Sequence, residues 1–127
     1  MDKDFAKWHE LKIKLQKKQS KVFFHEREIW LCSLGLNLGY EQDGKKKAFT
    51  RPVIIIRKFN FDIFWGIPLT SKEKDGKYYY SFDFGSRRSS GIISQVKLMD
   101  RKRLVRKLGI IKKKNFEELK KRITELL

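Results

Sequence analysis

The stretch Arg51–Thr70, RPVIIIRKFNFDIFWGIPLT, decides the fold of this chain. Its apolar run Val53–Ile56 is unbroken, which is typical of a β-strand covered on both faces. Asn60 then predicts a turn, and residues 61–69 predict a second strand in which apolar side chains alternate with others. The side chains expected to share the apolar face of that strand are Phe61, Ile63, Trp65, Ile67 and Leu69. Together the two strands predict a hairpin about Asn60.

Further strands are predicted on both sides of this hairpin. Residues 28–34 form a short apolar run rich in β-forming residues, and residues 77–84 carry an aromatic side chain at every second position. Residues 85–90 are expected to form a basic hairpin tip, and residues 91–99 a fifth strand. The polar stretch 35–50 contains three glycines and three consecutive lysines, which predicts a solvated loop.

Helices are predicted towards the two ends of the chain. Residues 4–19 have apolar side chains at helical spacing. A second helix is predicted over residues 100–108, with Asp100 as its capping residue and Gly109 as the residue that ends it. Asn115 with Glu118 predicts the capped start of a final helix. Five short strands with helices at the edges predict a small, strongly bent sheet or barrel, a mainly β fold of the α+β class.

Composition sets the broad class of the protein. The 127 residues include 31 Lys and Arg against 15 Asp and Glu, a net charge of +16, and 40% are hydrophobic. This length and apolar content predict one domain over residues 1–127 with a real core. No apolar run approaches the length of a membrane helix, and no signal-peptide core is present, so a cytoplasmic protein without membrane contact is expected. Its predicted partner is a polyanion, with nucleic acid first.

The excess charge is uneven along the chain. Residues 97–127 carry a net charge of +8, half of the total. Basic residues also cluster in short runs: Lys45–Lys47, Arg87–Arg88, Arg101–Arg103 and Lys112–Lys114. These runs either form separate solvated surfaces or converge on one binding face, and the sequence leaves both arrangements open.

Several kinds of chemistry lack the residues that they need. Cys32 is the only cysteine, which excludes an internal disulfide, and with two histidines it excludes a Cys/His zinc site. No carboxylates or histidines recur at metal-ligand spacing, and no phosphate-binding loop or dinucleotide motif is present, so no cofactor is expected. Cys32 lies inside an apolar strand, which favours a buried hydrophobe over a nucleophile. His9 and His25 are not placed together by any pattern.

A polar constellation at strand ends is the one candidate site. If the two central strands pair about Asn60, then Arg51 and Thr70 lie at the same end, with Ser71 beside them and Glu41 in the preceding loop. A guanidinium beside a hydroxyl at a sheet edge can bind a phosphate. The alternative is that Arg51 pairs with a carboxylate and Thr70 caps a turn.

Several short segments also occur in a recognisable order: Glu28-Ile29-Trp30, Gly39-Tyr40-Glu41-Gln42, Arg51-Pro52-Val53-Ile54-Ile55, Pro68-Leu69-Thr70-Ser71, Ser94-Gln95-Val96 and Asp100-Arg101-Lys102-Arg103-Leu104. Over residues 26–127 the chain resembles the PemK/MazF family of toxin endoribonucleases. The resemblance implies an SH3-like β-barrel with peripheral helices, usually a homodimer. It also implies cleavage of single-stranded RNA, notably messenger RNA, until a cognate antitoxin binds, with DNA contacted only through the antitoxin complex.

The resemblance assigns roles to individual residues. Arg51 and Thr70 match the active-site arginine and threonine of the family, and Glu41 matches a loop glutamate of several members. Gln95 matches a commonly retained strand position, which is interpreted as structural support or an RNA contact. Beside these matches, the other residues expected to contact RNA are Ser71 and the basic residues Lys45, Lys46, Lys47, Arg87 and Arg88. The implied chemistry is attack of the ribose 2′-hydroxyl on phosphorus without metal, which leaves a 2′,3′-cyclic phosphate and a 5′-hydroxyl. Arg51 would stabilise charge because arginine is a poor base, and Glu41 is the candidate base.

Three features depart from the family pattern. Residues 45–50 lengthen the loop before Arg51, Arg27-Glu28 replaces a common Gly-Asp, and the predicted helix at residues 4–19 is additional. A different class of function stays open beside the enzyme. It is a non-catalytic SH3-like module that binds nucleic acid through lysines and exposed aromatic side chains such as Tyr79.

Overall fold

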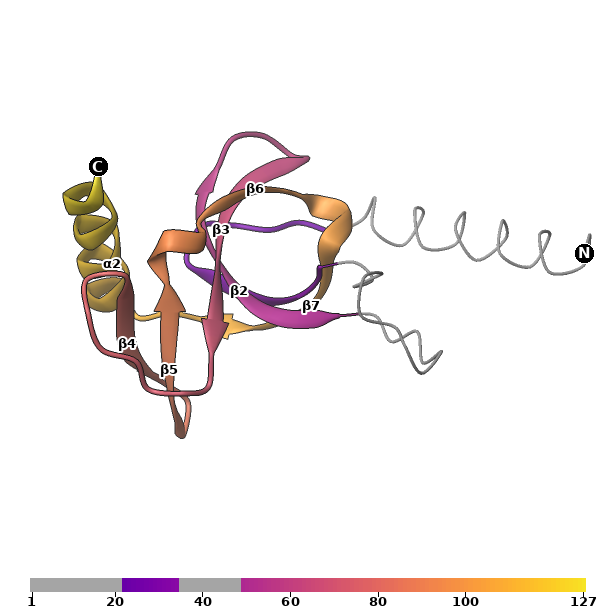
Figure 1. Ribbon diagram of the computed structural model, residues 1–127. Coiled ribbons are helices and arrows are strands. Elements are labelled where there is room, and N and C mark those ends of the chain that lie inside the picture. The colour runs from indigo at the N-terminus through magenta and orange to yellow at the C-terminus, as the bar shows by residue number, and fades with distance from the viewer. Residues whose placement is uncertain (1–21, 35–48) are drawn as a thin grey trace, which may run out of the picture.

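The computed structural model describes residues 22–34 and 49–127. The elements are β1 (Glu28–Ser33), β2 (Thr50–Lys58), β3 (Ile63–Thr70), β4 (Tyr79–Phe84), β5 (Arg87–Ile92), η2 (Ile93–Gln95), β6 (Lys97–Asp100), η3 (Arg101–Arg103), β7 (Leu104–Ile110) and α2 (Lys113–Leu126). The strands form one antiparallel sheet in the order β4-β5-β3-β2-β1-β7, with β6 also paired to β3. The predicted mainly β fold with a C-terminal helix is confirmed (Figure 1). The predicted helix at 4–19 lies outside the described residues.

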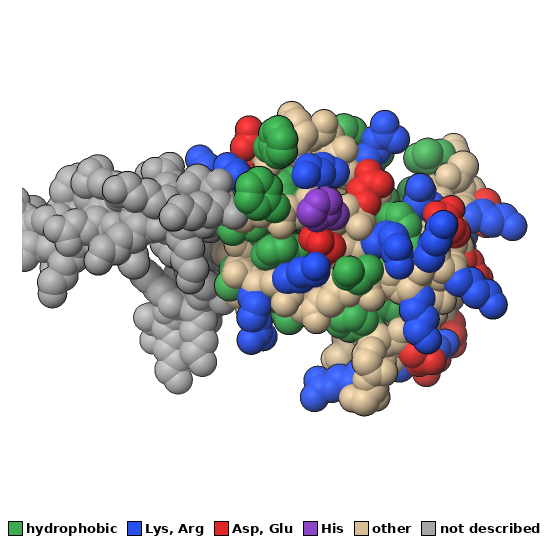
Figure 2. All heavy atoms as spheres, turned by 180° about the vertical axis from the view of Figure 1, so that it is seen from behind, with side chains coloured by type: hydrophobic (Ala, Val, Ile, Leu, Met, Phe, Trp, Pro, Cys, Tyr) green, Lys and Arg blue, Asp and Glu red, His purple; other side chains and the backbone are tan. Residues whose placement is uncertain are grey.

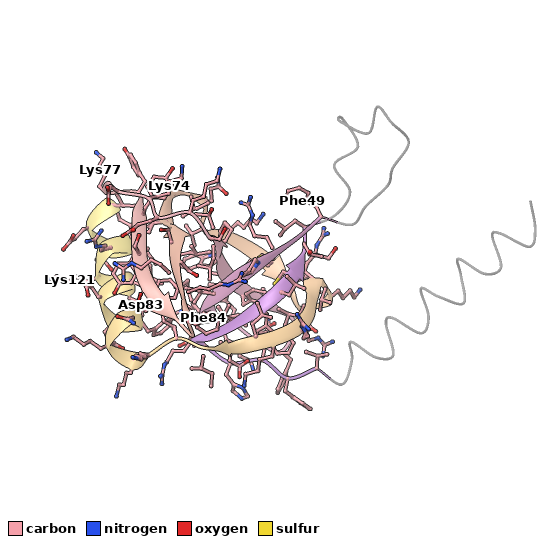
Figure 3. The ribbon with its side chains drawn as sticks, turned by 90° about the horizontal axis from the view of Figure 1, so that it is seen from below. Phe49, Lys74, Lys77, Asp83, Phe84 and Lys121 are labelled. Carbon is pink, nitrogen blue, oxygen red and sulfur yellow. The ribbon has the colours of Figure 1, made fainter. Side chains whose placement is uncertain are left out.

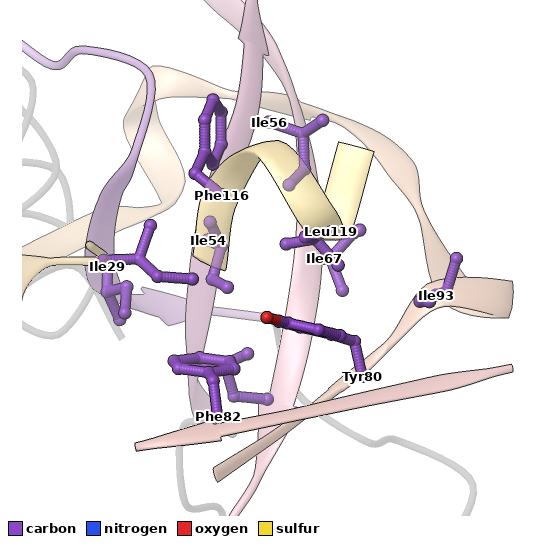
Figure 4. Close-up of a cluster of buried hydrophobic side chains, with 11 residues drawn as sticks. Ile29, Ile54, Ile56, Ile67, Tyr80, Phe82, Ile93, Phe116 and Leu119 are labelled. Carbon is purple, nitrogen blue, oxygen red and sulfur yellow. The ribbon is translucent and has the colours of Figure 1, made fainter. Parts of the chain in front are cut away.

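The sheet curls, so that it carries a separate hydrophobic core on each face. The outer core lies under β4, β5 and α2 and contains Ile29, Ile54, Ile56, Ile67, Leu69, Tyr80, Phe82, Ile93, Ile111, Phe116 and Leu119 (Figure 4). The inner core lies inside the curl and contains Phe24, Trp30, Cys32, Val53, Ile55, Phe64, Met99 and Leu104. Successive residues of β2 therefore enter opposite cores, and the prediction of a strand covered on both faces is confirmed.

The turn between β2 and β3 forms at the predicted residue. The Asn60 side-chain oxygen accepts hydrogen bonds from the backbone N–H groups of Asp62, at 2.8 Å, and Ile63, at 3.0 Å. The predicted apolar face of β3 is partly wrong, since Trp65 is 44% exposed and Phe61, in the turn, is 68% exposed. The outer layer of β4, β5 and α2 covers only the Ile67 end of the strand, because the sheet curls away from that layer towards the turn.

The strand predicted at residues 91–99 is interrupted, and the predicted hairpin tip at 85–90 is shorter. Strand β5 already begins at Arg87, which pairs with Phe84, so that only Gly85 and Ser86 remain for the turn. Gly85 adopts φ +61°, which a residue without a Cβ adopts easily. The 3-10 turn η2 then breaks the run before β6.

The helix predicted at residues 100–108 is wrong. Asp100 does accept a hydrogen bond from the Lys102 N–H at 2.8 Å, but it caps only the short turn η3. The chain continues as β7, in which Leu104 is 2% exposed in the inner core and the backbone pairs with β1. Burial of Leu104 and the backbone hydrogen bonds to β1 thus favour a strand over the helix that the Asp100 cap alone would favour.

The final helix begins at Lys113 and not at a cap on Asn115. Asn115 and Glu118 instead lie within the first turns of α2, where an oxygen of each lies 3.2 Å from the Tyr80 hydroxyl. Burial and the Glu118 carboxylate raise the pKa of Tyr80. The predicted capping box is therefore wrong, and its two polar side chains fix α2 to β4.

The Arg27-Glu28 pair before β1 ties three parts of the chain together. Arg27 adopts φ +77°, a conformation that a non-glycine residue rarely takes, and its guanidinium donates to the Ile111 carbonyl at 3.1 Å. Glu28 is 6% exposed and accepts hydrogen bonds from Trp30 Nε1 at 2.9 Å and from Lys107 Nζ at 3.1 Å. Burial raises the pKa of Glu28, but these bonds and one from the backbone of His25 outweigh it, and the pKa lies below its usual value.

Glu28→Gln should lower the free energy of unfolding by about 1–3 kcal/mol, because the Lys107 ammonium then faces an amide with no charge. A lowered pKa in the folded state means that the stabilisation is present above the unfolded pKa and is lost as the pH falls through the folded one. The free energy of unfolding, measured with urea, should therefore fall less between about pH 6 and pH 3 in the variant than in the wild type. The matched control is Glu125→Gln, on the exposed surface of α2. A decline as steep in Glu28→Gln as in the wild type would contradict this role.

Candidate functional site

The register of the central hairpin brings the predicted polar residues to one end. Val53 pairs with Pro68. Arg51 lies two residues before Val53 in β2, and Thr70 lies two residues after Pro68 in β3, so both are at the same end of the hairpin. Both line a cleft of about 520 Å³. The complete lining is Thr50, Arg51, Pro52, Leu69, Thr70, Ser71, Phe84, Arg87, Arg88, Ser89 and Leu108. Strands β2, β3, β4, β5 and β7 all contribute to the cleft or its rim.

Arg51 is half-buried near the start of β2, where its backbone pairs with Cys32 of β1. Its guanidinium carbon lies 5.9 Å from the centre of the Phe49 ring. Among the residues that the structure describes, no carboxylate forms an ion pair with Arg51. The guanidinium is thus held at the cleft by its backbone and an aromatic contact, and its donors are available to an anion.

Thr70 ends β3, and the turn that follows it is well fixed. The Thr70 hydroxyl accepts a hydrogen bond from the Lys72 N–H at 3.3 Å, as expected for a residue that caps a turn. Because the oxygen is the acceptor, its own hydrogen can still be donated into the cleft. Ser90, the partner of Thr70 on β5, accepts from the Lys74 N–H at 3.1 Å and lies 2.7 Å from the Ser81 hydroxyl.

Two arginines of β5 form the basic rim of the cleft. Arg88 lies 3.2 Å from Asp83 and 3.5 Å from Glu73, and the bond to Asp83 raises the pKa of the guanidinium. Arg87 is exposed, and within the described part of the chain it forms no ion pair. Arg88 is therefore neutralised in part by its neighbours, whereas Arg87 adds positive charge to the rim.

The floor of the cleft is apolar, and the sequence did not reveal it. Phe84 and Leu108 are half-buried side chains that pack against the outer core. Phe84 is labelled in Figure 3. A Cβ added to Gly109 would lie 2.7 Å from Cζ of the Phe84 ring, so the ring packs directly on the β7 backbone. Alternation placed Phe84 on an apolar face, but Leu108 fell in the wrongly predicted helix, so no signal joined the two residues.

Other predicted site residues lie elsewhere. Gln95 is exposed in η2 and does not line the cleft. Glu41, Lys45, Lys46 and Lys47 fall outside the described residues. The basic run at η3 and the one at the start of α2 lie on different sides of the fold (Figure 1), and lysines and arginines are scattered over the face in Figure 2.

Of the other reactive side chains, Cys32 and His25 do not line the cleft, and His9 lies outside the described residues. Burial raises the pKa of Cys32 to about 12, so this thiol stays protonated at neutral pH. His25 Nδ1 lies 3.3 Å from Glu28 Oε2, in the cluster that joins β1 to β7. Within residues 22–34 and 49–127, no group of three His, Cys, Asp or Glu side chains could hold a metal ion. In the same residues, no helix is long and apolar enough to span a membrane.

Residues 25–127 match the family described as PemK-like, MazF-like toxin of type II toxin-antitoxin system. Among solved structures, the Mycobacterium tuberculosis toxin MazF-mt6 is similar, with 16% identity and a TM-score of 0.58 over 78% of this chain and 94% of that chain. MazF from Deinococcus radiodurans has 12% identity and a TM-score of 0.62 over 84% of this chain and 97% of that chain. A mycobacterial endoribonuclease in complex with its cognate antitoxin has 10% identity and a TM-score of 0.61, over 79% and 90%. None of the curated proteins matches the sequence.

Gly109→Ala should lower the free energy of unfolding by about 1–3 kcal/mol, because the new methyl group overlaps the Phe84 ring and the ring must shift. Gly91→Ala is the matched control, since a Cβ there would meet its nearest neighbour at 3.5 Å, an ordinary van der Waals contact. Chemical denaturation of both variants measures the difference. Equal stabilities for the two variants would contradict the packing of Phe84 on β7.

Proposed function

The chain belongs to the PemK-like, MazF-like toxins of type II toxin–antitoxin systems, and from this membership we propose that it cleaves single-stranded messenger RNA and so stops translation. The resemblance in the sequence and the barrel-type fold that it implied are both confirmed. The observation that carries the proposal is the cleft in which Arg51 and Thr70 lie together at the ends of paired strands. Such a pair presents several donors to one phosphate.

In the proposed reaction the RNA supplies the nucleophile, and side chains of the cleft stabilise the charge that develops on the phosphate. The ribose 2′-hydroxyl gives up its proton and its oxygen attacks the adjacent phosphorus. The bond from phosphorus to the 5′-oxygen breaks, and the leaving oxygen takes a proton from water, so that a 2′,3′-cyclic phosphate and a 5′-hydroxyl result. Negative charge increases on the non-bridging oxygens during this step. The Arg51 guanidinium and the Thr70 hydroxyl donate hydrogen bonds to those oxygens, and Arg87 lies on the same rim. We propose Ser71, at the end of β3, as a further RNA contact.

The proton of the 2′-hydroxyl needs an acceptor. Arginine keeps its proton at neutral pH, and no carboxylate or imidazole belongs to the described lining of the cleft. We propose Glu41 as the base on its place in the sequence, in the segment that leads to Arg51. The run Lys45–Lys47 lies in the same segment and is proposed as an RNA contact, and Gln95 is proposed as one from the family resemblance of its strand position.

A cognate antitoxin is the proposed protein partner. The net charge of +16 favours an acidic antitoxin, and a similar mycobacterial endoribonuclease forms a complex with its cognate antitoxin. We further propose that the chain forms a homodimer in the cytoplasm and contacts DNA only through the antitoxin complex.

Purified protein should cut single-stranded RNA in the presence of EDTA, because the proposed step uses no metal ion. The new 5′ ends should be hydroxyls, which polynucleotide kinase labels without prior phosphatase treatment. Dependence on added Mg²⁺, or 5′-phosphate ends, would contradict the mechanism. Salt-sensitive binding with RNA still intact after long incubation would instead support the non-catalytic binding module.

Arg51→Ala and Thr70→Ala should each reduce the cleavage rate by about 100-fold or more, because each removes a donor to the reacting phosphate. Thr70→Ser keeps the hydroxyl and should retain much of the activity. Arg57→Ala is the matched control, since Arg57 lies on the same strand as Arg51 but at the turn end of the hairpin. Thermal unfolding of each variant checks that the fold is intact. Wild-type rates in both alanine variants would remove Arg51 and Thr70 from the reaction.

A further inference from the structure

We propose that Phe84 and Leu108 form a nucleobase subsite on the floor of the cleft, where one base of a single-stranded RNA stacks on the Phe84 ring. This inference rests on the proposed function and names the part of the substrate that the apolar floor receives. The base belongs to a nucleotide next to the phosphate held at Arg51 and Thr70. Neither floor residue carries a donor or an acceptor in its side chain, so the subsite acts by stacking and burial.

The floor is built as a fixed surface. Phe84 and Leu108 pack against the outer core on one side and line the cleft on the other. The tip of the Phe84 ring touches the backbone of β7, since a Cβ on Gly109 would lie 2.7 Å from Cζ and 2.9 Å from Cε1. A base that stacks there meets a ring that already holds its place, so little side-chain freedom is lost on binding.

The rim indicates which kind of molecule the floor receives. Arg51 and Arg87 stand on the rim of the cleft, and neither forms an ion pair with any other residue that the structure describes. No carboxylate belongs to the described lining. An aromatic surface beside unpaired arginines is the arrangement by which proteins hold single-stranded nucleic acids, with bases on the rings and phosphates on the cations. A neutral apolar ligand would leave both guanidinium groups without partners.

The subsite should contribute affinity at one nucleotide with little dependence on which base is present. Every base has a π-face, and the floor offers no hydrogen-bonding group that could distinguish one Watson–Crick edge from another. Removal of the base at that nucleotide should therefore weaken RNA binding, whereas exchange of one base for another should change the affinity less.

The test measures binding of RNA that the protein cannot cleave. Heptanucleotides with 2′-fluoro in place of every 2′-hydroxyl are compared by fluorescence anisotropy, and the tightest binder is remade with one abasic sugar at each position in turn. In the wild type, one position should weaken binding by about 5- to 100-fold when its base is absent. The Phe84→Leu variant should bind the intact RNA more weakly than the wild type does, by a similar factor. In this variant, an abasic sugar at the same position should reduce the affinity by no more than about a further twofold.

The comparison has two safeguards. Phe84→Met repeats the test with an unbranched apolar side chain in case leucine packs poorly, and the ratio of intact to abasic affinity within one variant does not depend on the folded fraction. Phe61→Leu is the matched control, because Phe61 is an exposed aromatic residue at the turn end of the hairpin and should keep the wild-type ratio.

The inference is overturned if no position in the wild type responds to loss of its base. It is also overturned if the abasic penalty is undiminished in the Phe84 variants. Because the assay measures binding alone, its outcome is separate from that of the proposed function. Protein that binds in this way but leaves natural RNA intact would overturn the nuclease and keep the subsite, and protein that cuts RNA without the Phe84 effect would do the reverse.

Discussion

Strands β2 and β3 pair antiparallel, and the arrangement of the site depends on the register of that pairing over Val53–Ile55. Alternate residues of Val53–Ile56 enter opposite cores, so a slip of one residue would exchange their cores and move every side chain of the strand to the other face. The register of Val53–Ile55 with Gly66–Pro68 carries Arg51 and Thr70 to one end of the hairpin, and it shifts by one residue between Ile55 and Arg57, on the side of the Asn60 turn. Burial of the strand interior thus determines the geometry at the strand end, where the polar side chains emerge.

Strands β5 and β7 complete the cleft at the end of the hairpin. Strand β5 pairs with the end of β3, fixes the turn after Thr70 through Ser90, and brings Arg87 to the rim. Strand β7 supplies Leu108 and the backbone against which Phe84 packs. The cleft is therefore a product of the whole curled sheet. The net charge of +16 favours a polyanionic partner, but the scattered lysines and arginines do not by themselves define a site.

The central hairpin and the juxtaposition of Arg51 with Thr70 could be predicted because apolar periodicity and a turn residue are local signals. The segment after residue 99 could not be predicted in this way. Asp100 locally favours the start of a helix, but pairing with β1 and burial of Leu104 make the segment a strand. The floor of the cleft was missed for the same reason. Phe84 and Leu108 come to line one cleft only through tertiary packing, which no spacing in the sequence encodes.

The central claim is that the reacting phosphate binds between Arg51 and Thr70. A crystal structure of the protein with an RNA that carries a 2′-deoxy sugar at the cleaved nucleotide tests it most directly, because the attacking group is absent and the substrate stays intact. We expect the phosphate beside that sugar within hydrogen-bonding distance of both the Arg51 guanidinium and the Thr70 hydroxyl. An RNA bound along the basic residues of η3 or α2, with no phosphate in the cleft, would contradict the account.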